Sequence, residues 1–172
     1  NLEEAFRLAK LAADQGRKDA QSYTGYCFRN GVGVERNYSQ AVHYLQLAAC
    51  QGGDSSAHYQ LGLCCSNGEG CEMSTVEALK YFRKAAKSGH GDAQYMLAIC
   101  YYYGKAVDVD LVEAVKYFKL AADQGDVNAL LFLGDCFYEG KGVPRRDKNE
   151  AKKIYKLAAA KGNETAVKAL KD

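Results

Sequence analysis

Apolar residues recur at helical spacing along the whole chain. In one segment they fall at Ala41, Tyr44, Leu45 and Ala48, and the same spacing returns in residues 78–85. Residues three or four positions apart lie on one face of an α-helix, so each such segment predicts an amphipathic helix. Helix breakers are few, and proline occurs once, at Pro144. The pattern therefore predicts an all-α chain.

Two helical segments alternate, and each returns after 36 or 37 residues. The first, named helix A, opens at Ala20, Ala57, Ala93 and Ala129. The second, named helix B, is followed by a glycine at Gly16, Gly52, Gly89, Gly125 and Gly162. A lone helix pair cannot bury both of its apolar faces, whereas stacked pairs can. The repeat therefore predicts an α-solenoid of stacked antiparallel helix pairs.

Each helix B carries a start signal and a stop signal. A capping residue stands three positions before a Gln or Glu, as in Asn37 and Gln40. This spacing is typical of a capping box, in which the two side chains satisfy free backbone N–H groups. The same signal occurs at Ser74, Asp110 and Asp147. We expect the closing glycines, and the Gly-x-Gly loops between A and B, to supply positive φ angles.

These boundaries predict one solenoid over residues 1–172. Residues 1–19 form helix B of a cut repeat, residues 20–56, 57–92, 93–128 and 129–165 form four full repeats, and residues 166–172 are the remnant of the next helix A. The chain starts at NLEEAF without a methionine, so we expect a longer parent protein. Because helix B at Asn1 has no partner, we also expect a tendency toward end-to-end self-association.

Charge and composition limit the classes of partner and the cell compartments that we expect. The chain has 23 basic and 21 acidic residues and a net charge of +2, which gives no electrostatic argument for nucleic acid. No apolar run approaches the roughly 18 residues that span a bilayer, so we expect no direct membrane insertion. The seven cysteines are an odd number. Disulfides are rare in reducing compartments, so this count favours a cytoplasmic over a secreted or luminal location.

The stretch CCSNGEGC, residues 64–71, holds three of the cysteines. Cys64 shares a helix A position with Cys27, Cys100 and Cys136, where we expect a small buried side chain. Cys65 replaces an aromatic residue and Cys71 replaces a valine of other repeats, while Cys50 stands at a position expected to be exposed. Adjacent helical cysteines point in different directions and no C-x-x-C pair occurs, so we predict no metal site and no cofactor.

Catalytic residues are not predicted either. His43, His58 and His90 share no position within the repeat, and we expect no catalytic histidine set. The Gly-x-Gly loops do not follow a strand and lack the phosphate-binding motifs. The chain is therefore predicted not to be an enzyme.

The repeat motif identifies a family. A-x-Y-x-L-G-x-C-Y, then G-x-G-V, then EA-x-x-Y-x-x-A-A-x-x-G resembles the SLR family (Sel-one-like repeats), relatives of the tetratricopeptide repeat; residues 57–89, 93–125 and 129–162 match best. Thr24, Ala98 and Ala106 depart from the motif. The resemblance implies a right-handed α-solenoid that serves as an adaptor or scaffold. A cysteine-rich branch of the family carries disulfides at positions that hold alanine here, such as Ala49 and Ala57, so that branch and its proposed hydrolase activity are disfavoured.

In related superhelices the A helices line a concave groove that binds a partner. Carrying this over gives a candidate surface rich in tyrosine, a residue suited to recognition. Its residues are Tyr26, Arg29, Asn30, Tyr59, Leu63, Asn67, Tyr95, Ile99, Tyr102, Tyr103, Asp135 and Tyr138. The leading hypothesis is a protein–protein interaction scaffold that binds a protein or peptide there. Packing of these tyrosines against the neighbouring repeat stays open, as does a role as a structural spacer between domains.

Overall fold

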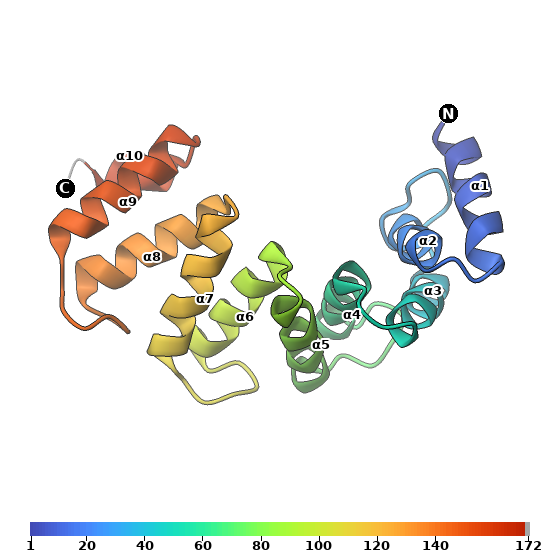
Figure 1. Cartoon of the computed structure of the whole chain (residues 1–172), viewed down its shortest axis with the longest axis horizontal. Coiled ribbons are helices and arrows are strands. Elements are labelled where there is room, and N and C mark those ends of the chain that lie inside the picture. Colours follow the sequence, from blue (N-terminus) through green and yellow to red (C-terminus); the bar gives the residue numbers. More distant parts are fainter. Residues whose placement is uncertain (171–172) are drawn as a thin grey trace. The chain divides into compact units, whose positions relative to one another are not determined.

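The chain folds into helices throughout the part that the computed structural model describes, residues 1–170 (Figure 1). The helices group into two compact units, residues 1–90 and residues 91–172, which are considered separately. The first unit contains α1 (Leu2–Asp14), α2 (Lys18–Asn30), α3 (Tyr38–Cys50), α4 (Ser55–Asn67) and α5 (Thr75–Lys87). The second contains α6 (Gly91–Tyr103), α7 (Leu111–Asp123), α8 (Val127–Glu139), α9 (Lys148–Ala160) and α10 (Glu164–Ala169). Residues 171–172, the end of the predicted remnant, lie outside the described residues.

Within each unit, helices that follow one another in sequence pack together. In the first unit α2 pairs with α3 and α4 with α5, while α1 packs on α2 and α3 on α4. In the second unit α6 pairs with α7 and α8 with α9, while α7 packs on α8 and α9 on α10. The all-α solenoid of antiparallel A–B pairs is thereby confirmed. The predicted repeat boundaries within residues 1–172 stay a prediction.

Helix B begins where its capping residue predicts. The side chains of Asn37 and Ser74 accept the backbone N–H of the residue three positions on, at 3.0 Å and 3.2 Å. Asp110 and Asp147 do the same. The backbone N–H that the reciprocal half of a capping box would bind is used by helix A, because Ser74 donates it to the Cys65 carbonyl at 2.8 Å. Glu77 instead forms an ion pair with Lys80 at 2.5 Å. Equivalent pairs join Glu113 to Lys116 and Glu150 to Lys153.

Helix A begins two residues earlier than the alanine pattern predicts. Asp54 and Asp126 accept the N–H groups of Ala57 and Ala129 at 2.8 Å, so they cap α4 and α8. The alanines are thus the third helical residues. The missed signal was an aspartate three positions before the alanine, the same spacing that marks helix B.

A close contact between helices A and B forms the core of each pair. A Cβ atom added to Gly62 of α4 would lie 2.5 Å from the Phe82 ring of α5. Gly134 and Tyr155 make the same contact between α8 and α9. At the corresponding place in α6, Ala98 is fully buried in the cluster that contains Phe118. Small residues in helix A therefore let the large side chains of helix B approach the backbone.

The A–B loops have the expected backbone. The loop glycines have positive φ, including Gly68 at 71° and Gly70 at 74°. Gly70 packs on the start of α3, because a Cβ atom there would lie 2.3 Å from the Tyr38 carbonyl oxygen. Gly142 packs in the same way on Leu111. Ala106 keeps this conformation with φ 58°, as the one non-glycine residue with positive φ within residues 1–170.

The cysteines follow the repeat. Cys27, Cys64, Cys100 and Cys136 are buried, and Cys50 is exposed, as predicted. Over residues 1–170, no group of three or more His, Cys, Asp or Glu side chains is arranged to hold a metal ion. In the same described range, every helix is too short or too polar to cross a membrane.

Candidate functional site

Two exposed tyrosines lie side by side on α2: Tyr26, which belongs to the candidate surface, and Tyr23. Tyr26 is 40% exposed, and its ring stacks on that of Tyr23 with centroids 6.4 Å apart. Both rings line a shallow pocket of about 310 Å³ together with Asp19, Ser22 and Asp54. The pocket thus combines aromatic rings with two carboxylates, a chemistry that suits a cationic or amide-rich group.

Polar residues of the candidate surface join α2 to the loop after α4. Arg29 binds Glu69 at 2.7 Å and the side-chain oxygen of Gln60 at 3.2 Å. Asn67 donates to Glu69 at 3.1 Å, and Asn30 donates to the backbone of its own helix, at the Tyr26 carbonyl. Arg29 is half-buried, so its charge is largely committed within the unit.

Tyr59 and Leu63 of α4 are less accessible than Tyr26. Tyr59 is half-buried and stacks on His90, with ring centroids 4.6 Å apart. It also lies 6.1 Å from the Phe82 ring, while Leu63 is half-buried. These side chains contribute to packing inside the unit.

In the second unit, four aromatic rings of α6, α7 and α8 form one cluster. Phe118 and Phe132 stack at 5.1 Å, and Tyr95 and Tyr102 surround them at 5.7–6.2 Å. Burial raises the pKa of the Tyr95 and Tyr102 hydroxyls. Ile99 is half-buried and packs against the same core. The cluster gives the surface a rigid aromatic base.

Tyr103 projects from this cluster. It is 55% exposed and meets Tyr102 edge-on, with centroids 4.9 Å apart. The Lys105 ammonium lies 5.7 Å from the Tyr103 ring, and the Lys141 ammonium lies 6.0 Å from the Tyr102 ring. The Lys141 ammonium is already paired with Glu139 at 2.6 Å. The Tyr103 ring beside the Lys105 ammonium suits a partner that carries both apolar and acidic side chains.

Asp135 lies within the α8–α9 pair. Its carboxylate accepts a hydrogen bond from the Tyr155 hydroxyl at 2.6 Å. Burial raises the pKa of Asp135, although the hydrogen bond from Tyr155 acts in the opposite direction. The Asp135 carboxyl group therefore joins α8 to α9, and only part of it is exposed to solvent.

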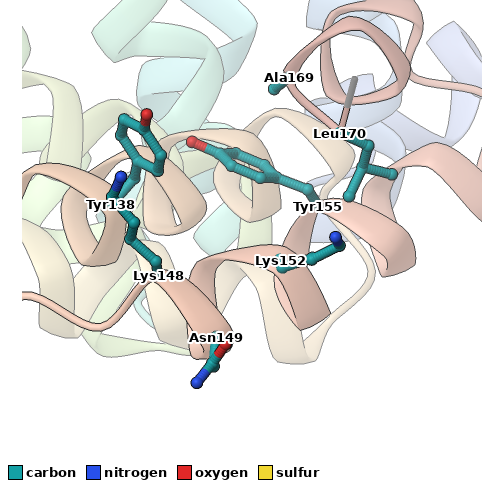
Figure 2. Close-up of a pocket in the computed structure, with 7 residues that line it drawn as sticks. All are labelled: Tyr138, Lys148, Asn149, Lys152, Tyr155, Ala169 and Leu170. Atoms are coloured by element: carbon teal, nitrogen blue, oxygen red, sulfur yellow. The ribbon is translucent and has the colours of Figure 1, made fainter. Parts of the chain in front are cut away.

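Tyr138 is 39% exposed and lines a second pocket, of about 220 Å³, with side chains from α8, α9 and α10 (Figure 2). The ammonium group of Lys148 lies 5.1 Å from its ring. Lys148 opens helix B at the position that Tyr38 and Leu111 hold in other repeats, where the loop of the following repeat packs. The pocket lies at the start of a helix B, where a repeat loop packs elsewhere in the chain. We therefore assign it no ligand.

The histidines have separate local roles. The Nδ1 atom of His58 lies 2.7 Å from the Asp54 carbonyl oxygen, and His90 stacks on Tyr59. His43 lies exposed beside the Tyr44 ring. Each histidine ring therefore has a local contact of its own.

Two aromatic residues of these surfaces were missed in the sequence. Tyr23 and Phe132 both occupy the fourth position of helix A, counted from Ala20 and Ala129, next to the third position that was carried over. The spacing of Asp19, Tyr23 and Tyr26, four and three residues apart, places them on one helix face and would have revealed the first pocket.

The chain matches the family model of the Sel1 repeat five times. The matches cover residues 1–16, 18–53, 55–90, 91–126 and 127–163. Among curated proteins, no sequence matches the chain.

Solved structures of similar fold come from several bacteria. A Sel1 repeat protein of Oxalobacter formigenes shares 35% identity with a TM-score of 0.90, over 99% of this chain and 49% of that chain. A protective antigen of uropathogenic Escherichia coli that displays an SLR fold shares 37% identity with a TM-score of 0.87, over 94% of this chain and 34% of that chain. Cysteine-rich protein B of Helicobacter pylori shares 27% identity with a TM-score of 0.60, over 78% of this chain and 96% of that chain. The chain thus spans about half of the first structure and about a third of the second.

Proposed function

Because the chain belongs to the Sel1 repeat family, we propose that it is a protein-interaction module that holds a protein or peptide partner on the exposed faces of its A helices. Proteins of this family are typically helical-repeat modules for protein interaction, and the fold is typically a non-catalytic scaffold. The observation that carries the proposal is the set of exposed tyrosines on helix A that have charged side chains nearby. Tyr26 and Tyr103 are the leading examples, one in each unit.

The physical basis is low entropic loss on binding. A tyrosine presents a large amphipathic surface and has few rotatable bonds to immobilise. Tyr103 leans on the Tyr102 ring, and Tyr26 on the Tyr23 ring, so part of this ordering is already present in the free protein. Preorganised aromatic residues of this kind often become hot spots at interfaces.

A peptide-display selection tests the proposal. The chain is used to select binders from a random peptide library, and their affinities are measured by calorimetry for the unaltered chain and its variants. We expect Tyr26→Ala or Tyr103→Ala to weaken binding by about tenfold or more, since truncation of a hot spot costs roughly 1.4 kcal/mol or more.

The matched controls are leucines on B helices with similar exposure. Leu47 and Leu120 are each 40% exposed, as Tyr26 is. Leu47→Ala and Leu120→Ala should leave affinity within about twofold. Equal losses in the tyrosine and leucine variants, or no enrichment of peptides over an empty support, would refute the proposal.

A further inference from the structure

Two free thiols touch at the end of α4. The Sγ atoms of Cys65, in the last turn of the helix, and Cys71, in the following loop, lie 3.6 Å apart. Cys65 is buried and Cys71 is half-buried. This contact lies outside the proposed binding surface, and of the four full repeats only this one carries cysteine at both positions.

The fold explains why these thiols meet. Their positions in the first full repeat are held by Phe28, which lies in a buried apolar cluster, and Val34, which packs against that cluster. The loop is also held close to the helix, because Ser74 donates its backbone N–H to the Cys65 carbonyl at 2.8 Å. Gly70 lies against the Tyr38 carbonyl on the other side. The two cysteines thus occupy positions that hold apolar packing residues in another repeat of the chain, and the fold places them side by side.

We propose that Cys65 and Cys71 form a disulfide across the A–B loop when the protein meets a low-molecular-weight disulfide such as oxidised glutathione. A disulfide has an S–S length of about 2.05 Å, so the sulfur atoms must approach by roughly 1.5 Å. Cys71 lies on a loop, where side-chain rotation and a small backbone shift supply this movement.

The reaction proceeds by two exchanges. The half-buried Cys71 reacts first as the thiolate, attacks a sulfur of oxidised glutathione and releases one glutathione thiolate. Cys65 then loses its proton, attacks the Cys71 sulfur of the mixed disulfide and releases the second glutathione. Two protein thiols are oxidised and one glutathione disulfide is reduced to two thiols.

The surroundings favour this order. Burial and the neighbouring Cys71 raise the pKa of Cys65 to about 12, so its thiol is protonated and a poor first nucleophile. Cys64 is adjacent in sequence, but it is fully buried, and burial raises its pKa to about 11. Cys50 is exposed on α3 and serves as an internal reference for attack by the same oxidant.

Mass spectrometry tests the bridge. The complete chain is incubated with oxidised glutathione, its remaining thiols are alkylated, and it is cleaved after acidic residues. Cleavage at Asp54, Glu69 and Glu72 separates residues 55–69 from residues 70–72 unless a disulfide joins them. We expect the joined peptides, lighter by two hydrogen atoms than their sum and separated by reductant, while Cys50 carries glutathione.

Variants and fragmentation identify the bridged cysteine. The joined species should disappear in Cys65→Ala and Cys71→Ala and persist in Cys64→Ala. Fragmentation of the joined peptides from the unaltered chain makes the same assignment without any variant. The proposal is overturned if Cys50 carries glutathione while residues 55–69 and 70–72 separate with both thiols alkylated. Attachment of Cys71 to Cys64 would overturn it as well.

Discussion

Ala106 has a left-handed backbone conformation at a position where other repeats carry glycine. Its φ is 58°, close to the 68° of Gly33 and the 69° of Gly142. A side chain in this conformation brings Cβ too close to the carbonyl oxygen and costs roughly 1–2 kcal/mol. The sequence marked Ala106 as a departure from the motif, and the structure shows that the loop keeps its shape despite it.

Ala106→Gly should therefore raise the free energy of unfolding by about 1 kcal/mol, less any entropic loss from the added glycine. Urea denaturation measures this change. Ala98→Gly in the interior of α6 is the opposite control and should lower the same quantity by about 1 kcal/mol. A loss of stability in Ala106→Gly would contradict the strain at this position.

The cysteines differ in reactivity because of burial. Burial raises the pKa of Cys64 to about 11 and that of Cys136 to about 12, and both side chains are fully buried. At mildly alkaline pH, iodoacetamide should label the exposed Cys50 well before either of them, since the thiolate is the nucleophile. Peptide mapping over time measures the order. Labelling of Cys64 at the rate of Cys50 would show that the helix A position is open to solvent.

Asp135 links stability to pH. Its pKa is raised in the folded state, so the folded protein binds the proton more tightly than the unfolded chain does. Its contribution is most favourable in acid and is lost as pH rises through the folded-state pKa. Asp135→Asn keeps an oxygen that can accept from Tyr155 but has no charge to desolvate.

The stability of Asp135→Asn relative to the unaltered chain should therefore rise between about pH 3 and pH 7. Thermal unfolding across this range measures the difference. A difference that stays constant with pH would contradict the raised pKa.

At the scale of elements, the contacts between loops and helices distinguish otherwise similar glycines. Gly52 and Gly70 have nearly the same φ, 76° and 74°. A Cβ atom at Gly52 would meet no atom within 4 Å, whereas one at Gly70 would lie 2.3 Å from the Tyr38 carbonyl oxygen. Packing between repeats therefore requires a glycine at position 70 but not at position 52.

Gly70→Ala should therefore lower the free energy of unfolding by about 1–3 kcal/mol more than Gly52→Ala does, because it adds a steric clash to the same backbone strain. Chemical denaturation of both variants gives the difference. Equal losses would mean that the loop does not press on the start of α3.

The sequence predicts the starts of the B helices better than the starts of the A helices or the contacts of the loops. The starts of helix B follow from local capping residues such as Asn37, whose hydrogen bonds form within one turn. The alanine pattern alone places the starts of helix A two residues too late, because the caps that set these starts are the aspartates three positions before Ala57 and Ala129. The Cys65–Cys71 contact was not predicted, since it depends on how the loop folds back on its helix.

At the scale of the molecule, the two units offer different chemistry on the same helix type. The α2 surface pairs tyrosines with Asp19 and Asp54, while the surface around Tyr103 pairs tyrosines with lysines. The sequence located the tyrosine-rich helices through the repeat. The sequence could not predict which of these tyrosines are exposed to solvent. Tyr59, for example, is half-buried by contacts with His90 and Phe82, which come from elsewhere in the unit.

Hydrogen exchange of a complex shows whether helix A holds the partner. The chain is measured alone and with a display-selected peptide. We expect slower exchange in α2 or α6, near Tyr26 or Tyr103, and little change in α3 and α7 around Leu47 and Leu120. Protection centred on those B-helix surfaces, with α2, α4, α6 and α8 unchanged, would contradict the assignment of partner binding to helix A.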